Sequence, residues 1–113
     1  MGLDQRVFTR EDTNIFDWRK HNRLQGWMEE LWRTKTDSKD EFNLEELELE
    51  IEVIEKLEQD IINKKLPVTK GFFFGDDSYV EYEKWYLEHD LKFIKVAKEI
   101  LKDGQRIFYS SWW

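Results

Sequence analysis

The run Arg106-Ile107-Phe108-Tyr109-Ser110-Ser111-Trp112 decides whether this chain is a bundle of helices or a fold that contains a sheet. It follows Gly104, a residue type that commonly ends a helix, and it is short, mostly apolar and rich in aromatic side chains. Such a run is typical of a β-strand. The sequence therefore predicts a sheet in which residues 106–112 form one strand.

Two other segments are expected to join this strand. Residues 3–9 alternate loosely, and residues 72–74 are phenylalanines between Gly71 and Gly75, which indicates a buried strand or an extended loop. No alternation of strand, helix and strand supports a parallel sheet. The predicted fold is α+β, with about three amphipathic helices packed on a small antiparallel sheet formed by the N-terminal segment, residues 72–74 and residues 107–112.

Two of the helices follow from apolar stripes and capping patterns. The first is expected from residue 16 to about residue 34, after turn and N-cap residues at 12–14, with a stripe of Leu24, Trp27, Met28, Leu31 and Trp32. The last is expected from residue 79 to about residue 102, with Ser78 and Glu81 as a capping box. Its stripe is Leu87, Leu91, Ile94, Ala97 and Leu101.

The segment between them has two interpretations. Asn43 and Glu46 form a capping-box pattern, which predicts a helix from residue 43 to about residue 64 with one solvated acidic face, ended by Pro67. Residues 47–53 also alternate with period two, so a strand is the alternative. The cap and the length of the segment favour the helix.

Alternation within residues 106–112 also predicts which side chains face the helices. Phe108, Ser110 and Trp112 share one face, and Ile107, Tyr109, Ser111 and Trp113 share the other. We expect Phe108 and Trp112 to face the helices, with Trp112 buried.

Composition limits the class of protein. The 113 residues fit a single domain (1–113), and the absence of cysteine fits a reducing cytoplasm. No stretch has the length and apolarity of a membrane span, so we expect a soluble protein without membrane contact. The net charge of −7 opposes binding to duplex nucleic acid, although an acidic helix at residues 43–64 leaves nucleic-acid mimicry open. Aromatic residues make up 16% of the chain, which suits both core edges and binding surfaces.

Polar residues replace the apolar stripe at the start of the first expected helix. Followed backwards from Leu24, the stripe reaches His21, Lys20 and Asp17, so this end is either exposed or lines a polar cleft. We predict that residues 17–22 lie near the last strand, where Tyr109, Ser110 and Ser111 offer polar partners.

Residues with catalytic or metal-binding chemistry are few. Asp17 and His21, with His89 and Asp90, would hold a divalent metal only if the fold brought all four together, and we expect neither a metal nor a cofactor. There is no phosphate loop, dinucleotide fingerprint, HExxH motif or nucleophile elbow. No catalytic residue is assigned, and a small hydrolase or transferase using the His and Asp residues is the alternative function.

Four motifs taken in order resemble a known family. They are the opening Met1-Gly2-Leu3-Asp4, Trp18-Arg19-Lys20-His21-Asn22, Gly71-Phe72-Phe73-Phe74-Gly75 and Tyr109-Ser110-Ser111-Trp112. Together they resemble a family of small, uncharacterised proteins encoded by tailed bacteriophages and prophages. Members are sometimes labelled phosphoglycerate kinase, but this chain is far too short for two nucleotide-sandwiching domains and lacks their glycine patterns.

The resemblance implies a phage accessory protein in the cytoplasm of the infected host and brings no established activity. We expect a non-catalytic binding module that captures a small host ligand, such as a nucleotide-like signal, or docks on a host protein. The oligomeric state is left open. The residues expected to bind are Trp18, Arg19, Lys20, His21, Asn22, Tyr109, Ser110 and Trp112.

Overall fold

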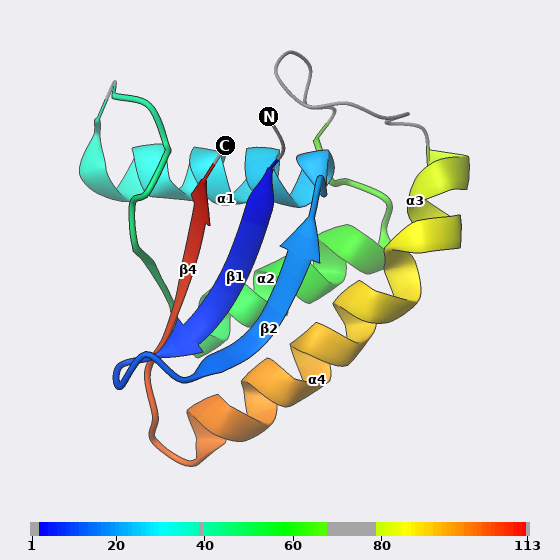
Figure 1. Ribbon diagram of the computed structural model, residues 1–113. Coiled ribbons are helices and arrows are strands. Elements are labelled where there is room, and N and C mark those ends of the chain that lie inside the picture. The colour runs from blue at the N-terminus through cyan, green and yellow to red at the C-terminus, as the bar shows by residue number, and fades with distance from the viewer. Residues whose placement is uncertain (1–2, 39, 68–78, 113) are drawn as a thin grey trace.

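The structure is a computed structural model that describes residues 3–38, 40–67 and 79–112 (Figure 1). In chain order its elements are β1 (Asp4–Thr9), β2 (Asn14–Arg19), α1 (Asn22–Thr36), β3 (Leu47–Leu49), α2 (Ile51–Ile62), α3 (Tyr79–Trp85), α4 (Leu87–Lys102) and β4 (Ile107–Trp112). The strand or loop expected at residues 72–74 and the capping residue Ser78 lie outside the described residues.

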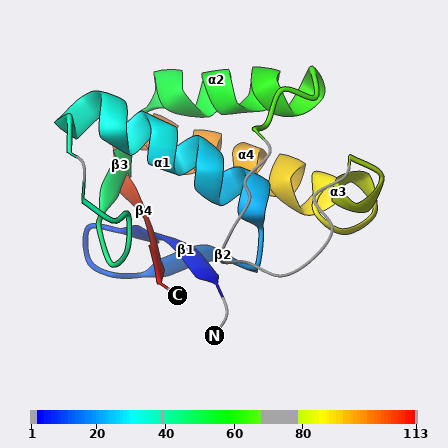
Figure 2. The same cartoon turned by 90° about the horizontal axis from the view of Figure 1, so that it is seen from above.

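The strands form one antiparallel sheet in the order β2-β1-β4-β3, and the helices cover one of its faces. Figure 2 shows three layers, with the sheet and α2 on opposite sides of α1 and α4. The predicted α+β class, with helices packed on a small antiparallel sheet, is confirmed. Strands β1 and β4 lie at its centre, paired from Asp4 with Trp112 to Thr9 with Ile107, as the two predicted strands require.

The predicted first helix is wrong at its start, because β2 occupies residues that were expected to be helical. Asp12 adopts the left-handed region (φ 66°), and the Asp12 amide donates to the Thr9 carbonyl at 2.9 Å, which turns the chain back along β1. Left-handed backbone is one that Asp tolerates better than most residues. Residues 14–19 then pair with β1 instead of continuing the apolar stripe of the helix.

Helix α1 begins only after a second left-handed residue, Lys20 (φ 56°), which ends the hairpin. The His21 side chain caps the helix, since Nδ1 accepts from the Leu24 amide at 3.4 Å. Beyond this point the predicted stripe is confirmed: its buried members are Leu24, Trp27, Met28 and Trp32.

The segment predicted as one helix from residue 43 contains a short strand followed by a helix. Leu47 and Leu49 are buried in the short edge strand β3, so the helix predicted from residue 43 starts instead at Ile51. Leu44 in the left-handed region (φ 63°) is incompatible with a helix at the predicted cap. Beyond it, α2 buries an apolar stripe at Ile54, Leu57 and Ile61.

The last predicted helix is two helices, α3 and α4, which meet at Tyr86. Its predicted end is confirmed, because Gly104 adopts the left-handed region (φ 84°) directly after the cap residue Asp103. Ile94 and Ala97 are buried as expected, whereas Leu91 is 39% exposed and Phe93 and Asp90 take the buried positions.

The predicted facing of β4 is wrong. Ile107, Tyr109 and Ser111 point to the helices and are at most 1% exposed, whereas Trp112 is 41% exposed on the outer face. Phe108 is on that outer face too, stacked on Phe8 with ring centroids 5.9 Å apart. Trp113 lies outside the described residues.

Side chains occupy backbone groups at both edges of the sheet. At β2 the His89 ring donates to the Asp17 carbonyl at 3.1 Å, and the Tyr86 hydroxyl donates to the Arg19 carbonyl at 3.2 Å. Burial and the nearby Asp90 carboxylate raise the pKa of Tyr86, so its hydroxyl keeps the proton that it donates. At β3 the Lys35 ammonium donates to the Glu48 carbonyl at 3.1 Å.

Candidate functional site

Asp90 of α4 is the centre of a buried polar cluster behind the sheet. Its carboxylate, 1% exposed, accepts from Trp18 Nε1 at 2.8 Å, from Tyr82 Oη at 2.8 Å and from His21 Nε2 at 2.7 Å. A buried carboxylate is tolerable only when its oxygens are bonded in this way. This one residue therefore joins β2, the start of α1, α3 and α4.

The hydrogen bonds of His21 assign its tautomer. Since Nδ1 accepts from the Leu24 amide, the ring proton is on Nε2 and points at Asp90. The imidazole is 1% exposed and stacks on Tyr86, with ring centroids 4.2 Å apart. This His and Asp pair lies in the core, where its contacts hold four elements together, and not on a surface that a substrate reaches.

A second polar chain connects α1 to the sheet through β1. Gln5 Nε2 donates to the His21 carbonyl at 3.0 Å and lies 2.9 Å from Tyr109 Oη, which itself donates to Gln25 Oε1 at 2.6 Å. Burial raises the pKa of Tyr109, so its phenol stays protonated and remains a donor. The predicted proximity of residues 17–22 to the last strand is confirmed, with the rings of Trp18 and Tyr109 6.4 Å apart.

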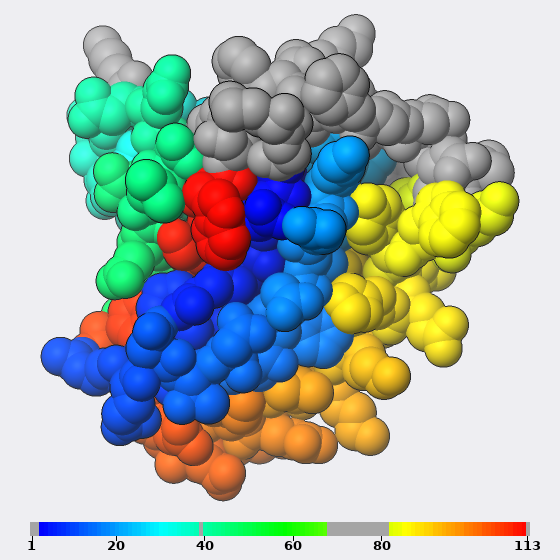
Figure 3. All heavy atoms as spheres, in the orientation of Figure 1, coloured from blue at the N-terminus to red at the C-terminus, as the bar shows by residue number. Residues whose placement is uncertain are grey.

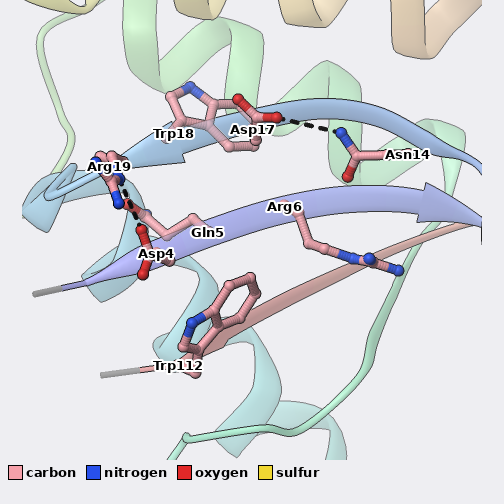
Figure 4. A pocket seen from close by; sticks show the side chains of 8 residues that line it. All are labelled: Asp4, Gln5, Arg6, Asn14, Asp17, Trp18, Arg19 and Trp112. Carbon is pink, nitrogen blue, oxygen red and sulfur yellow. Dashed lines mark hydrogen bonds and ion pairs between the residues drawn. The ribbon is translucent and has the colours of Figure 1, made fainter.

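The opposite face of the sheet is open to solvent and carries a groove. Figure 3 shows atoms of β1, β2 and β4 at the surface with no helix in front of them. The groove encloses about 400 Å³, and its lining residues, drawn in Figure 4, are Asp4, Gln5, Arg6, Asn14, Asp17, Trp18, Arg19 and Trp112. Gln5 and Trp18 are buried, so mainly the other side chains meet a ligand.

Register places the exposed side chains of the groove in two rows. Asp4 is opposite Arg19 on one side and Trp112 on the other, and Arg6 is opposite Asp17 and Ser110. The first row contains an ion pair, since Arg19 Nε lies 2.9 Å from Asp4 Oδ1. Asp17 of the second row accepts from Asn14, whose Nδ2 lies 3.2 Å from Asp17 Oδ2 (Figure 4). Arg6 pairs with Asp12 and lies over the Phe8 ring.

The eight sequence-predicted binding residues are divided between the two faces of the sheet. Arg19 and Trp112 present their side chains to the groove, Ser110 is half-buried on the same face, and Lys20 is exposed at the turn beyond β2. The remaining four point into the core and are Trp18, His21, Asn22 and Tyr109.

Sequence reasoning missed five residues that line the groove: Asp4, Gln5, Arg6, Asn14 and Asp17. The sequence pattern predicts Asp17 at the polar start of a helix, whereas it lies in β2. The alternation of residues 3–9 does place Asp4 and Arg6 on one face of a strand. It does not show that β2 lies beside this strand, and the groove exists only because of that pairing.

The four residues considered for a metal do not converge on one point. Asp17 is exposed on the groove face, and His21 and Asp90 are buried behind the sheet. Within residues 3–38, 40–67 and 79–112, no group of three or more His, Asp or Glu side chains has the arrangement of a metal site.

Comparison of the chain with protein-family models, with curated proteins and with solved structures finds no match. Among the described helices, none combines the length and the apolar character that crossing a bilayer requires.

Proposed function

We propose that this chain is a phage accessory protein that acts in the cytoplasm of the infected host as a non-catalytic binding module. Its ligand is a small, planar, nucleotide-like molecule, and the groove on the open face of the sheet is the binding site. One observation carries this proposal: an exposed tryptophan, Trp112, lies beside the ion pair of Asp4 and Arg19 in one row across three strands.

The chemistry of this row suits a nucleobase. Trp112 is 41% exposed, and stacking of a base on an aromatic side chain is worth about 1–3 kcal/mol. The Arg19 side chain is 85% exposed and, among the described residues, its side chain makes one ion pair, through Nε. Both terminal amino groups of its guanidinium are therefore available to ligand oxygens. A volume of about 400 Å³ falls within the range of small-molecule sites.

Charge favours a single small ligand over a nucleic-acid strand. The two arginines of the groove are balanced by Asp4 and Asp17, and the chain as a whole carries a net charge of −7. A polynucleotide would meet repulsion along its length, whereas a mononucleotide carries only a few charges, for which the exposed Lys20 beyond β2 offers a partner.

Isothermal titration calorimetry with a panel of nucleoside monophosphates tests the proposal. We expect Trp112→Ala and Arg19→Ala each to weaken binding about 10-fold or more. Trp85→Ala is the matched control, because Trp85 is 63% exposed on α3, away from the groove. NMR spectra of the nucleotide recovered after binding should show that it is chemically unchanged. Equal affinity of the wild type and of both groove variants would refute the site.

Docking on a host protein is the second candidate function. It is favoured by Leu44, which is 72% exposed and is held beside β4 by the bond from its amide to the Ser111 carbonyl at 2.8 Å. Leu44 is thus bonded to the residue that precedes the exposed Trp112, and exposed apolar side chains that form a contiguous patch are typical of protein contacts. A host protein identified by co-purification should lose affinity for Leu44→Ser, whereas nucleotide affinity should not change.

A further inference from the structure

The inference concerns which base the groove accepts, and it rests on the proposed function. Asp4 is central, because register places Arg19 and Trp112 on either side of it. Directly opposed residues of antiparallel strands have Cα atoms about 4.5–5.5 Å apart, so the backbone spacing of these three residues matches the span of one purine nucleotide.

The carboxylate of Asp4 retains capacity to accept hydrogen bonds. Its side chain is 32% exposed, and its contact with Arg19 uses Oδ1. Within the part of the chain that the structure describes, Oδ2 has no donor. A carboxylate has about four lone-pair sites, so both oxygens can accept from a ligand while the ion pair persists.

Together, Asp4 and Arg19 form an ordered array of acceptors followed by donors. The two carboxylate oxygens accept, and the terminal amino groups of the guanidinium, on the β2 side, donate. Guanine presents the complementary array along one edge, with the amino group and N1–H as donors and then O6 and N7 as acceptors. Adenine and cytosine each set a ring-nitrogen acceptor against the carboxylate, and uracil flanks its single N–H with two carbonyl oxygens.

We propose that the groove selects a guanine nucleotide, with the base stacked on Trp112, its N1–H and amino group bonded to Asp4, and O6 bonded to Arg19. Asp4 is the residue that determines specificity. Arg19 both reads O6 and holds the carboxylate in position through Nε.

Calorimetry with GMP, IMP, XMP and AMP tests this on the wild-type protein. IMP lacks the amino group, and XMP replaces it with a carbonyl that faces the carboxylate. One hydrogen bond to a charged group corresponds to roughly a 10-fold to 100-fold change in affinity, so GMP should bind at least about 10-fold more tightly than IMP. XMP and AMP should bind more weakly still.

Asp4→Asn should shift the preference of the groove from GMP towards XMP. An amide offers one acceptor and one donor, so GMP affinity should fall at least about 10-fold and XMP affinity should rise. Glu55→Gln changes an exposed carboxylate of α2, outside the groove, and should leave the order of affinities unchanged, with thermal melts checking that each variant is folded.

The outcomes separate this inference from the proposed function. Binding that depends on Trp112 but does not distinguish GMP from AMP overturns guanine selection and leaves the binding module intact. The absence of binding by all four nucleotides overturns both the selection and the nucleotide-like class of ligand.

Discussion

Removing the Asp90 carboxylate should destabilise the protein more than any change in the groove. Asp90→Ala removes the carboxylate to which three buried groups donate: Trp18 Nε1, Tyr82 Oη and His21 Nε2. Each buried donor without a partner costs about 1–3 kcal/mol. Water entering the vacated space restores part of this bonding, so we expect a loss of about 4 kcal/mol in the free energy of unfolding. Small domains have only about 5–15 kcal/mol in total.

Urea denaturation followed by circular dichroism measures this loss. A milder variant keeps the test usable if Asp90→Ala does not fold: Trp18→Phe removes one donor, keeps an aromatic ring and should cost about 1.5 kcal/mol. Asp17→Ala is the control, since this exposed carboxylate bonds only to Asn14 among the described side chains, and it should change stability by less than about 0.5 kcal/mol. If Asp90→Ala cost less than about 1 kcal/mol, the cluster would not hold the four elements together.

Three further predictions concern the backbone, the outer face and pH. Leu44→Gly should raise the thermal midpoint by a few degrees, because Leu44 is 72% exposed and its backbone is in the left-handed region. This conformation costs a non-glycine residue about 1–2 kcal/mol. An unchanged or lower midpoint would show that the backbone at Leu44 is not strained. Trp112→Ala should reduce stability less than Tyr109→Phe, which removes a buried hydroxyl bonded to Gln25, and chemical denaturation showing the reverse order would place Trp112 in the core. Hydrogen bonds from Arg106 hold the pKa of Glu48 below its usual 4.5, so this pair stabilises the fold above that pH and loses its effect as pH falls through the lowered pKa. Glu48→Gln should therefore flatten the acid limb of a stability profile slightly, and a limb identical to that of the wild type would show that the pair contributes nothing.

Local periodicity was sufficient for the parts of the fold that depend on one segment. Strand β4, strand β1 and the buried stripe of α1 all follow from patterns within about ten residues. Strand β2 does not, because Phe16 and Trp18 are a single period-two pair, and they directly precede residues that continue the helical stripe of α1. Residues 14–19 form a strand because they pair with β1 and because Trp18 bonds to Asp90, a partner 72 positions away.

The candidate site shows the same limit. Period two correctly grouped Phe108, Ser110 and Trp112 on one face, but alternation does not say which face the helices cover. That choice depends on the packing of Tyr109 against α1 and of Phe108 on Phe8. Residues 17–22 were predicted to approach the last strand and do, yet only strand register places Asp4 and Arg6 in the groove.

The side chains that occupy the sheet edges limit how this protein associates. An uncovered edge is a template on which a strand of another chain adds by backbone hydrogen bonds, the usual route to swapped dimers and fibres. Here His89 and Tyr86 already use carbonyls of β2, and Lys35 uses one of β3. A strand from another chain would have to displace His89 and Tyr86 at β2, or Lys35 at β3, to use these carbonyls. Addition of strands at the edges of the sheet is thus disfavoured even at high protein concentration. A ligand is directed instead to the open face, where recognition depends on side chains and hence on the chemical identity of the ligand.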